Sequence, residues 1–322
     1  MPLKPSDDWS GKRVVVTGAG GFIGSHLTER LVNLGASTTA FLRYNSRSDV
    51  GLIDECPAEV RSEIHVAWGD LGDPDSVRLA LRKADVVFHL GALVGIPYSY
   101  EAPRQYVDAN VLGTLNVLEA ARAGDVGRVV HTSTSEVYGT PLYTPIDEKH
   151  PLQGQSPYSA SKIGADKLAE SFWRTYKLPI ATLRPFNTFG PRQSARAILP
   201  TIIRQALKGS EIRLGSLTPI RDMNFVGDTV DGFIRIASSD AALGRVVNIG
   251  SGRGLTVGEM VESVSKALEK TIAVVGDPDR VRPPNSEVEA LIADATLAHQ
   301  LFEWSSVTPF EEGLKRTIEW FS

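Results

Sequence analysis

Short apolar runs rich in β-branched residues alternate with helical patterns along the first 185 residues, and this rhythm constrains the fold more than any other feature. The predicted strands are Arg13–Thr17, Thr38–Leu42, Ile64–Trp68, Val86–Leu90, Val129–Thr132 and Ile180–Leu183. The predicted helices between them are Ser25–Leu34, Pro74–Arg82, Tyr106–Ala123 and Pro157–Tyr176. Strands that alternate with helices in this way form a parallel sheet with helices on both faces. The sequence therefore predicts an α/β fold, a Rossmann-type doubly wound parallel sheet that binds ligands beyond the carboxyl ends of its strands.

The rhythm changes after Pro185, where longer loops separate the predicted elements. These elements are helices Leu199–Leu207, Val257–Leu268 and Pro309–Phe321, strands Ile212–Leu214 and Val246–Ile249, and a loop over Gly276–Asn285. We predict a dinucleotide-binding domain over residues 1–185, with a segment near 222–250 that returns to it. Residues 186–322 are predicted to form a smaller C-terminal α/β domain that binds the substrate and is interleaved with the first.

The composition, 42% hydrophobic and 22% charged, is that of an ordinary globular protein. The net charge is −4, so no basic excess points to nucleic acid or a membrane surface, and an anionic ligand must be held by a few placed groups. The single cysteine, Cys56, excludes an internal disulfide, and the six histidines lack metal-ligand spacing, so no metal is predicted. No apolar signal core or run of about 18 apolar residues occurs, which favours a soluble, cytoplasmic protein.

A glycine-rich loop, Thr17–Gly24, joins the first predicted strand to the first predicted helix. Its glycines at 18, 21 and 24 suit a tight turn, a close approach of the backbone to a pyrophosphate and close packing of helix on sheet. The free N–H groups of the helix N-terminus attract phosphate. The alternative is a turn without a ligand, but after the first strand of such a fold the pattern favours a dinucleotide. The predicted contacts are Gly18, Gly21, Phe22, Ile23 and Gly24.

The end of the second strand bears on which dinucleotide binds. An acid about 20 residues beyond the glycines favours NAD. Here the strand ends in Arg43, and no acid occurs from Phe41 to Arg47. Arg43, Asn45, Ser46 and Arg47 are predicted to hold a 2′-phosphate, which favours NADP over NAD; the alternative is a loop of solvated charges. Asp70 and Leu71, after the third strand, are predicted near the adenine, although Asp70 would equally cap the next turn.

Tyr158 and Lys162 form a second constellation on the helix that Ser156 and Pro157 begin. The spacing of four residues places both side chains on one helix face. A free tyrosine, with a pKa of about 10, is a poor base at neutral pH, but a nearby ammonium and a positively charged nicotinamide favour the phenolate. We predict Tyr158 as the base for a sugar or alcohol hydroxyl; a surface pair is the alternative.

Thr134, Ser135 and Glu136 follow the fifth predicted strand, at the sheet edge where ligands bind. In an extended strand Ser135 would face away from the other two, so all three reach the site only if the chain already turns at Ser135. The alternative is a polar loop whose hydroxyls bond its own backbone. Glu136 discriminates between functions, because a simple dehydrogenase or epimerase needs no additional carboxylate there.

Together, the glycine loop, the Tyr158/Lys162 pair, Asn110 in NVLGT and the RPFN run at 184–187 resemble the extended short-chain dehydrogenases/reductases that act on nucleotide sugars. The likeness continues through Arg221-Asp222, Asp228, Asn248-Ile249-Gly250 and Arg282-Pro283. The stretch Thr134–Gly139 resembles the 4,6-dehydratase subgroup. Gly95–Tyr100 and Arg184–Ala197 further resemble the legionaminic-acid-pathway dehydratases, whose substrate is a nucleotide-linked N-acetylglucosamine. Arg43 departs from the acid that many relatives carry.

The resemblance implies an NAD(P)-dependent lyase with a tightly bound, recycled cofactor. Tyr158, helped by Thr134 and paired with Lys162, takes the O4 proton while the C4 hydride passes to the nicotinamide. Glu136 removes the C5 proton, and water leaves from C6 with acid help from Ser135 or protonated Glu136. The hydride then returns to C6. A nucleotide-sugar epimerase, a uronate decarboxylase and, in another class, a non-catalytic dinucleotide-binding regulator remain alternatives.

The resemblance also implies further contacts and a homodimer that pairs the helices Tyr106–Ala123 and Pro157–Tyr176. The implied cofactor contacts, besides those above, are Leu90, Ala92, Asn110, Tyr158, Lys162 and Pro185. The implied contacts with the nucleotide sugar are Pro97, Ser99, Asn187, Arg192, Leu199, Arg221, Asn248 and Arg282. The nucleotide base, the C2 substituent and the stereochemistry at C5 are left open.

Overall fold

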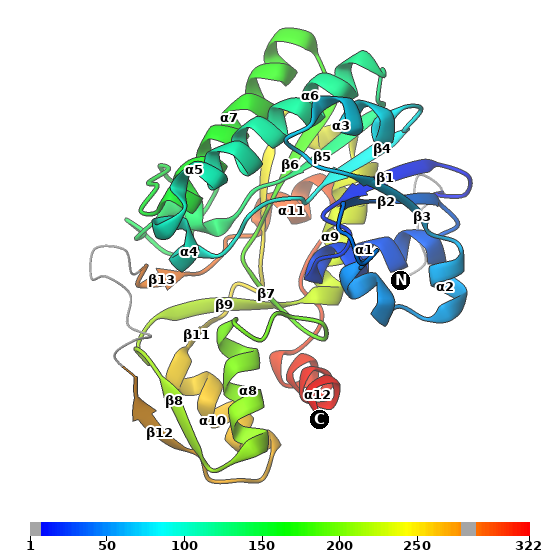
Figure 1. The fold of residues 1–322 in the computed structure, drawn as a ribbon. Coiled ribbons are helices and arrows are strands. Elements are labelled where there is room, and N and C mark those ends of the chain that lie inside the picture. Colours follow the sequence, from blue (N-terminus) through cyan, green and yellow to red (C-terminus); the bar gives the residue numbers. More distant parts are fainter. Residues whose placement is uncertain (1–7, 278–287) are drawn as a thin grey trace.

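A seven-stranded parallel sheet forms the centre of the computed structural model, which describes residues 8–277 and 288–322 (Figure 1). The strand order is β10-β6-β5-β4-β1-β2-β3, and every neighbouring pair is parallel. The strands are β1 Arg13–Thr17, β2 Ser37–Arg43, β3 His65–Gly69, β4 Val86–His89, β5 Arg128–Thr132, β6 Ile180–Pro185 and β10 Val246–Ile249. The predicted doubly wound sheet and its first six strands are therefore confirmed, with boundaries that shift by one or two residues.

Helices cover both faces of this sheet, as Figure 1 shows. Alternating residues of β1 enter two cores: Val14 and Val16 pack with α1 (Phe22–Asn33) and α9 (Val226–Ser238), whereas Val15 packs on the opposite face. The helices on that second face are α3 Pro74–Leu81, α6 Gly113–Ala123 and α7 Pro157–Tyr176. Burial on both faces explains why the strands read as nearly continuous apolar runs.

The predicted helix 106–123 is more complex than expected. It is preceded by two short helices, α4 Ile96–Glu101 and α5 Pro103–Tyr106, and its first part is a π-helical segment, η3 Val107–Leu112, that continues into α6. Other short elements are η2 Gly51–Glu55, α2 Ala58–Ser62, η4 Ser135–Tyr138 and η5 Asp240–Ala242. The turn η4 is the one that matters for the site, because it follows β5 directly.

Smaller sheets lie in the lower part of Figure 1. One joins β7 Asn187–Phe189, β9 Ile220–Phe225, β11 Gly254–Thr256 and β13 Ala290–Leu291, and the other pairs β8 Glu211–Leu214 with β12 Ala273–Gly276. The helices of this part of the chain are α8 Ile198–Lys208, α10 Val257–Ala267, α11 Thr296–Phe302 and α12 Phe310–Phe321. The predicted α8, β8, α10 and α12 are confirmed, whereas β7, β9, α9, β11, β12, β13 and α11 were not predicted.

Strand β10 belongs to the main sheet although it lies far along the chain from the other six. It pairs with β6, with Asn248 opposite Arg184. The division into two domains remains a prediction. Among the described residues, no helix is long and apolar enough to cross a membrane.

Candidate active site

The glycine loop forms a close-packed cradle between β1 and α1. Gly18 has φ +71°, and a Cβ there would lie 2.8 Å from the backbone nitrogen of Gly91. A Cβ on Gly24 would lie 2.1 Å from the carbonyl oxygen of Gly18, so only glycine permits this packing. Gly21 is the N-cap of α1, and no side chain of the described chain caps that helix end. Phe22 and Ile23 open the helix. The exposed N–H groups and the absence of Cβ atoms suit a pyrophosphate.

The residues around this cradle come from the ends of β3 and β4. The backbone nitrogens of Leu90 and Gly91 donate to the oxygen atoms of Thr17, 3.2 Å to its carbonyl and 3.0 Å to its hydroxyl. Leu71 lies against Gly91, since a Cβ there would meet the Leu71 side chain at 2.7 Å. Ala92 follows on the same loop and is half-buried. The loop ends of β3 and β4 therefore meet beside the glycine loop.

The arginine-bearing loop after β2 lies open to solvent. Arg43 is paired with Asp70, Nε to Oδ2 3.3 Å, while the Arg43 side chain is 84% exposed. The Asn45 side chain organises the loop itself, because its oxygen accepts from the backbone nitrogens of Arg47 and Asp49. Ser46 and Arg47 are exposed. Asp70 also accepts from the backbone nitrogen of Gly72, so it serves the next turn as well as Arg43.

Tyr158 and Lys162 sit on the first turns of α7, which begins at the predicted N-cap Ser156 with a capping box to Ser159. Both side chains are buried. The Lys162 ammonium donates to the carbonyl oxygen of Thr132 at 2.6 Å. Burial lowers the pKa of Lys162 to about 8, and the negative charge of Asp166 opposes this fall.

The electrostatics of Tyr158 differ from the expectation. Burial raises the pKa of Tyr158 well above its ordinary value, and the nearby charge of Glu136 raises it further. The hydrogen bond with Thr134 lowers the pKa of Tyr158, but by less than burial raises it. In the protein alone the pKa of Tyr158 is thus raised, and the expected lowering by Lys162 together with a bound nicotinamide stays a prediction.

The segment after β5 turns where the sequence analysis required it to. Thr134 is extended, with φ −156°, and is the N-cap of η4, whose first residue is Ser135. The Thr134 hydroxyl oxygen accepts from the backbone nitrogen of Glu136 at 3.3 Å, which leaves its own proton free to donate to Tyr158. Ser135 is buried and Glu136 is half-buried. The turn thus brings Thr134, Glu136 and Tyr158 together.

Asn110 performs a structural task that sequence reasoning missed. Its amide oxygen accepts from the backbone nitrogen of Leu93 at 2.8 Å, and its amide nitrogen donates to the Leu93 carbonyl and to the Ser161 hydroxyl. Both amide protons are therefore used inside the protein, and Asn110 ties the loop after β4 to α7. Pro185, the last residue of β6, is buried at the carboxyl edge of the sheet.

Several predicted substrate residues are committed to the protein interior. Leu199 is fully buried in the hydrophobic core, so its side chain offers no surface to a substrate. Arg192 forms a buried ion pair with Glu29 of α1, 2.6 Å, and also donates to the Glu55 carbonyl. The expectation that Leu199 and Arg192 contact the nucleotide sugar does not fit these positions, because core packing and an internal carboxylate already occupy them.

The remaining predicted contacts differ in whether their polar atoms are already bonded within the protein. Asn248 accepts from the Tyr138 hydroxyl at 2.8 Å and donates to the Ile146 carbonyl, so its amide is also occupied. Arg221 is buried and donates to the carbonyls of Ile220 and Val288. The Asn187 amide oxygen is buried without a hydrogen-bond partner in the described chain, which leaves it able to accept from a ligand. Ser99 donates to the Ile96 carbonyl, Pro97 is exposed, and Arg282 lies outside the described residues.

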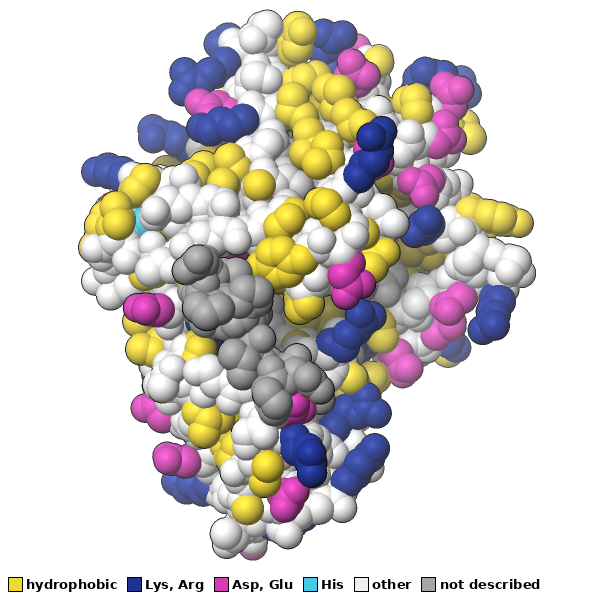
Figure 2. Space-filling model, turned by 60° about the vertical axis from the view of Figure 1, so that its left-hand side comes forward, with side chains coloured by type: hydrophobic (Ala, Val, Ile, Leu, Met, Phe, Trp, Pro, Cys, Tyr) yellow, Lys and Arg dark blue, Asp and Glu magenta, His cyan; other side chains and the backbone are white. Residues whose placement is uncertain are grey.

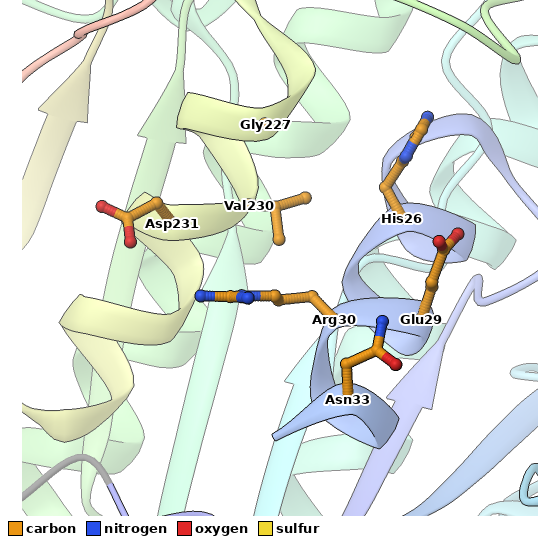
Figure 3. A pocket seen from close by; sticks show the side chains of 7 residues that line it. All are labelled: His26, Glu29, Arg30, Asn33, Gly227, Val230 and Asp231. Carbon is orange, nitrogen blue, oxygen red and sulfur yellow. The ribbon is translucent and has the colours of Figure 1, made fainter. Parts of the chain in front are cut away.

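A pocket of about 310 Å³ lies between α1 and α9 (Figure 3). None of the predicted catalytic residues lines it; the lining residues are His26, Glu29, Arg30, Asn33, Gly227, Val230 and Asp231.

Within the described ranges no three His, Cys, Asp or Glu side chains are grouped to hold a metal ion. On the face drawn in Figure 2, Lys and Arg side chains are interspersed with Asp and Glu, so that face presents no continuous basic surface.

Comparisons with known proteins identify the family of this chain. Residues 15–317 match the family described as GDP-mannose 4,6 dehydratase. Relatives over 96% of this chain are a UDP-glucose 4-epimerase of Mycolicibacterium smegmatis (33% identical, 98% of that protein covered), a dTDP-glucose 4,6-dehydratase of Streptomyces antibioticus (32%, 92% covered) and a UDP-N-acetyl-α-D-glucosaminuronate decarboxylase of Bacillus cytotoxicus (30%, 98% covered).

Solved structures agree over nearly the whole chain. The UDP-N-acetylglucosamine 4-epimerase of Methanobrevibacter ruminantium, in complex with UDP-N-acetylmuramic acid, superposes with a TM-score of 0.87 at 29% identity and covers 97% of this chain and 98% of that one. A dTDP-glucose 4,6-dehydratase of Streptomyces venezuelae with NAD bound gives 0.83 at 28% identity and covers 96% of both chains. The fold and site therefore define an extended short-chain dehydrogenase/reductase. This chain belongs to the GDP-mannose 4,6 dehydratase family, within a superfamily of nucleotide-sugar dehydratases, epimerases and decarboxylases.

Proposed function

We propose that this chain is a nucleotide-sugar 4,6-dehydratase that uses NADP or NAD as a recycled cofactor and acts on a nucleotide-linked N-acetylglucosamine. The observation that carries the proposal is the half-buried carboxylate of Glu136, whose charge acts on Tyr158. Oxidation and reduction at C4 alone need no second base. A carboxylate beside the tyrosine supplies the base that elimination across C5 and C6 requires.

Each step has a residue to perform it. Tyr158 takes the proton of the O4 hydroxyl, with its oxygen hydrogen-bonded to Thr134. When bound, the nicotinamide accepts the C4 hydride and later returns it to C6. The resulting 4-keto group acidifies the C5 proton, which Glu136 removes. The C6 hydroxyl leaves as water with a proton from Ser135 or from protonated Glu136, and C5 is then reprotonated.

The glycine cradle suits the pyrophosphate of a dinucleotide, because a Cβ at Gly18 or Gly24 would fill it. We propose NADP over NAD, since Arg43 and Arg47 are exposed beside the cradle and can pair with a 2′-phosphate. The pairing of Arg43 with Asp70 works against this choice, and a similar solved dehydratase binds NAD. The ratio of the dissociation constants for NADP and NAD tests this preference. Tighter binding of NAD would contradict the proposal that the protein prefers NADP.

The substrate proposal rests on few placed groups rather than on a basic surface. Asn187 has an unused buried acceptor, and Arg221 lies in the same small sheet, with Asn187 opposite Met223 in the β7–β9 pairing. The sugar and nucleotide contacts at Pro97 and Arg282 remain predictions. We also propose that the chain acts in the cytoplasm as a homodimer paired through α6 and α7.

The test is incubation of the purified protein with a panel of UDP-, GDP-, CDP- and dTDP-linked sugars, read by mass spectrometry. The proposal predicts a product that has lost one water from a nucleotide-linked N-acetylglucosamine. An isobaric product indicates an epimerase, as in the Mycolicibacterium relative, and would remove the assigned role of Glu136. Loss of carbon dioxide from a uronate indicates a decarboxylase.

The decarboxylase is the second candidate because such enzymes also carry a Thr-Ser-Glu stretch, present here at Thr134–Glu136. A non-catalytic dinucleotide-binding regulator is disfavoured by the intact Tyr158, Lys162 and Glu136. Tight binding of nucleotide sugars without turnover of any member of the panel would instead favour such a regulator.

A further inference from the structure

A cluster of buried polar side chains lies directly behind the reactive residues. It joins Asp166 of α7 to His131 of β5, Ser133 after β5 and Arg184 of β6, and we call these four residues the Asp166 cluster. His131 Nε2 lies 3.0 Å from Asp166 Oδ1, and both the Ser133 hydroxyl and Arg184 Nη2 donate to Asp166 Oδ2, at 2.6 and 2.7 Å. Arg184 also donates to the Ser133 hydroxyl. The two carboxylate oxygens thus accept three hydrogen bonds.

The cluster is withdrawn from solvent, with the Asp166 and Arg184 side chains only 4% and 3% exposed. Although burial pulls the pKa of Asp166 upward, the hydrogen bond from His131 and the charge of Arg184 hold it well below its ordinary value. Asp166 is therefore a buried anion at neutral pH. A buried ion pair is costly to assemble, so its presence calls for a specific role.

The cluster adjoins the reactive residues on two sides. Asp166 lies one helical turn beyond Lys162, on the same helix face. Ser133 lies between Thr132, whose carbonyl accepts the Lys162 ammonium, and Thr134, which bonds Tyr158. Arg184 extends the network to η4 by donating to the Tyr138 hydroxyl at 2.7 Å. The cluster therefore contacts the helix of the tyrosine–lysine pair and both ends of the turn that carries Glu136.

The other ionisable groups around Lys162 and Tyr158 do not supply a fully buried negative charge. Burial lowers the pKa of His89 on β4 and of His131, so both are neutral at neutral pH. Tyr106 on α5 and Tyr158 have raised pKa values and are neutral as well. Glu136 on η4 is half-buried and faces Tyr158. Asp166 is thus the buried anion that balances the two buried cations, Arg184 and Lys162.

We propose that Asp166 is a positioning residue of the reaction, which keeps the Lys162 side chain charged and holds the Thr134–Glu136 turn in place through Ser133. This inference rests on the proposed function only for its kinetic readout. Without Asp166, the buried cations Lys162 and Arg184 would lose the carboxylate whose negative charge acts on both. An arginine does not lose its proton in proteins, so Lys162 is the group that becomes neutral.

The experiment compares Asp166→Asn with Glu170→Gln, which removes a carboxylate one turn further along α7, where Glu170 pairs with exposed Lys167 and Arg174. Activity of the intact protein is measured against pH. The wild type is expected to lose activity as the pH rises through about 8, because Lys162 then loses its proton. In Asp166→Asn this alkaline limb is expected at least about one pH unit lower. That shift corresponds to an additional activity loss of about fivefold at pH 8, which approaches tenfold at higher pH. Glu170→Gln is expected to keep the wild-type limb.

Two further measurements keep the inference falsifiable. If Asp166→Asn does not fold, the double variant Asp166→Asn with Arg184→Met removes both buried charges, and its alkaline limb is still expected below that of the wild type. NMR titration of the Lys162 ammonium, assigned with Lys162→Met, reads the same shift without any substrate. A Lys162 titration that is unchanged in Asp166→Asn overturns the inference. Absence of turnover by the wild type contradicts the proposed function instead and leaves the titration valid.

Discussion

Two arginines at the carboxyl edge of the same sheet differ in how far they are buried and paired. Arg184, at the end of β6, is 3% exposed and bonds Asp166, Ser133 and Tyr138. Arg43, at the end of β2, is 84% exposed and has one loose pairing, with Asp70. A buried, fully paired cation is preorganised, whereas an exposed one adapts to a ligand at little cost. The comparison indicates that the sheet is rigid at the end of β6, near the proposed reactive residues, and adjustable at the end of β2, where we propose that the adenosine of the cofactor binds.

The rigid end holds the reactive residues, so the largest effect is expected there. Tyr158→Phe removes the base for the O4 hydroxyl, and kcat is expected to fall by about 10³-fold, within the range for acid–base catalysis. Cofactor binding, followed by fluorescence, is expected to remain. Tyr176→Phe, at the exposed end of the same helix, is the control and should keep full activity. Retention of most activity by Tyr158→Phe would contradict the assignment.

Glu136 separates elimination from oxidation. Glu136→Gln preserves the shape of the side chain but cannot take the C5 proton, so dehydration is expected to fall by about 10²-fold or more. Reduction of the bound cofactor by substrate should persist, because Tyr158 is intact; it is followed by absorbance of the reduced nicotinamide. Glu119→Gln on the exposed side of α6 is the matched control. Full dehydration by Glu136→Gln would remove the role assigned to this carboxylate.

Stability distinguishes buried from exposed arginines. Arg184→Met leaves Asp166 charged and unpaired in the interior, and the free energy of unfolding is expected to fall by about 3–5 kcal/mol. Arg174→Met breaks a pair with Glu170 in which the arginine is 73% exposed, and less than about 1 kcal/mol is expected. Urea denaturation measures both. Equal losses in the two variants would contradict the contrast between buried and exposed arginines.

The adjustable end should change selectivity rather than rate. Arg43→Ala is expected to weaken NADP binding by about tenfold, which corresponds to about 1.4 kcal/mol, and to leave NAD binding nearly unchanged. Arg78→Ala, an exposed arginine paired with Asp75 on α3, is the control. Isothermal titration with both cofactors checks the result. An equal loss for NAD and NADP would mean that Arg43 does not contact the 2′-phosphate.

The sequence could predict elements whose signals are local. The glycine loop, the Ser156 cap and the apolar strands carry their evidence within a few residues, and all of them appear in the structure. The turn at Ser135 was predictable only as a condition for the chemistry. Strand β9 was missed because Arg221, Asp222 and Asn224 resemble loop residues although they are buried. Asp222, for example, accepts from the backbone of Gly252 and Ala293, partners far along the chain.

The same limit explains the site residues that sequence reasoning misjudged or missed. Arg192 reads as a phosphate ligand, yet its partner Glu29 lies on a helix 163 residues earlier. The partners of Asp166 come from two strands, and its spacing from Lys162 was the one local signal that could have found it. Long-range pairing decides whether a polar residue serves a ligand or the fold, and no local pattern contains that information.

The central claim is that Glu136 and Tyr158 together eliminate water across C5 and C6. The most direct test is the reaction of the wild-type protein with UDP-N-acetylglucosamine and its GDP, CDP and dTDP counterparts in D₂O, read by mass spectrometry and NMR. The account predicts a 4-keto product that has lost one water and carries one solvent deuterium at C5. An isobaric product with its original hydrogen at C5 would contradict it.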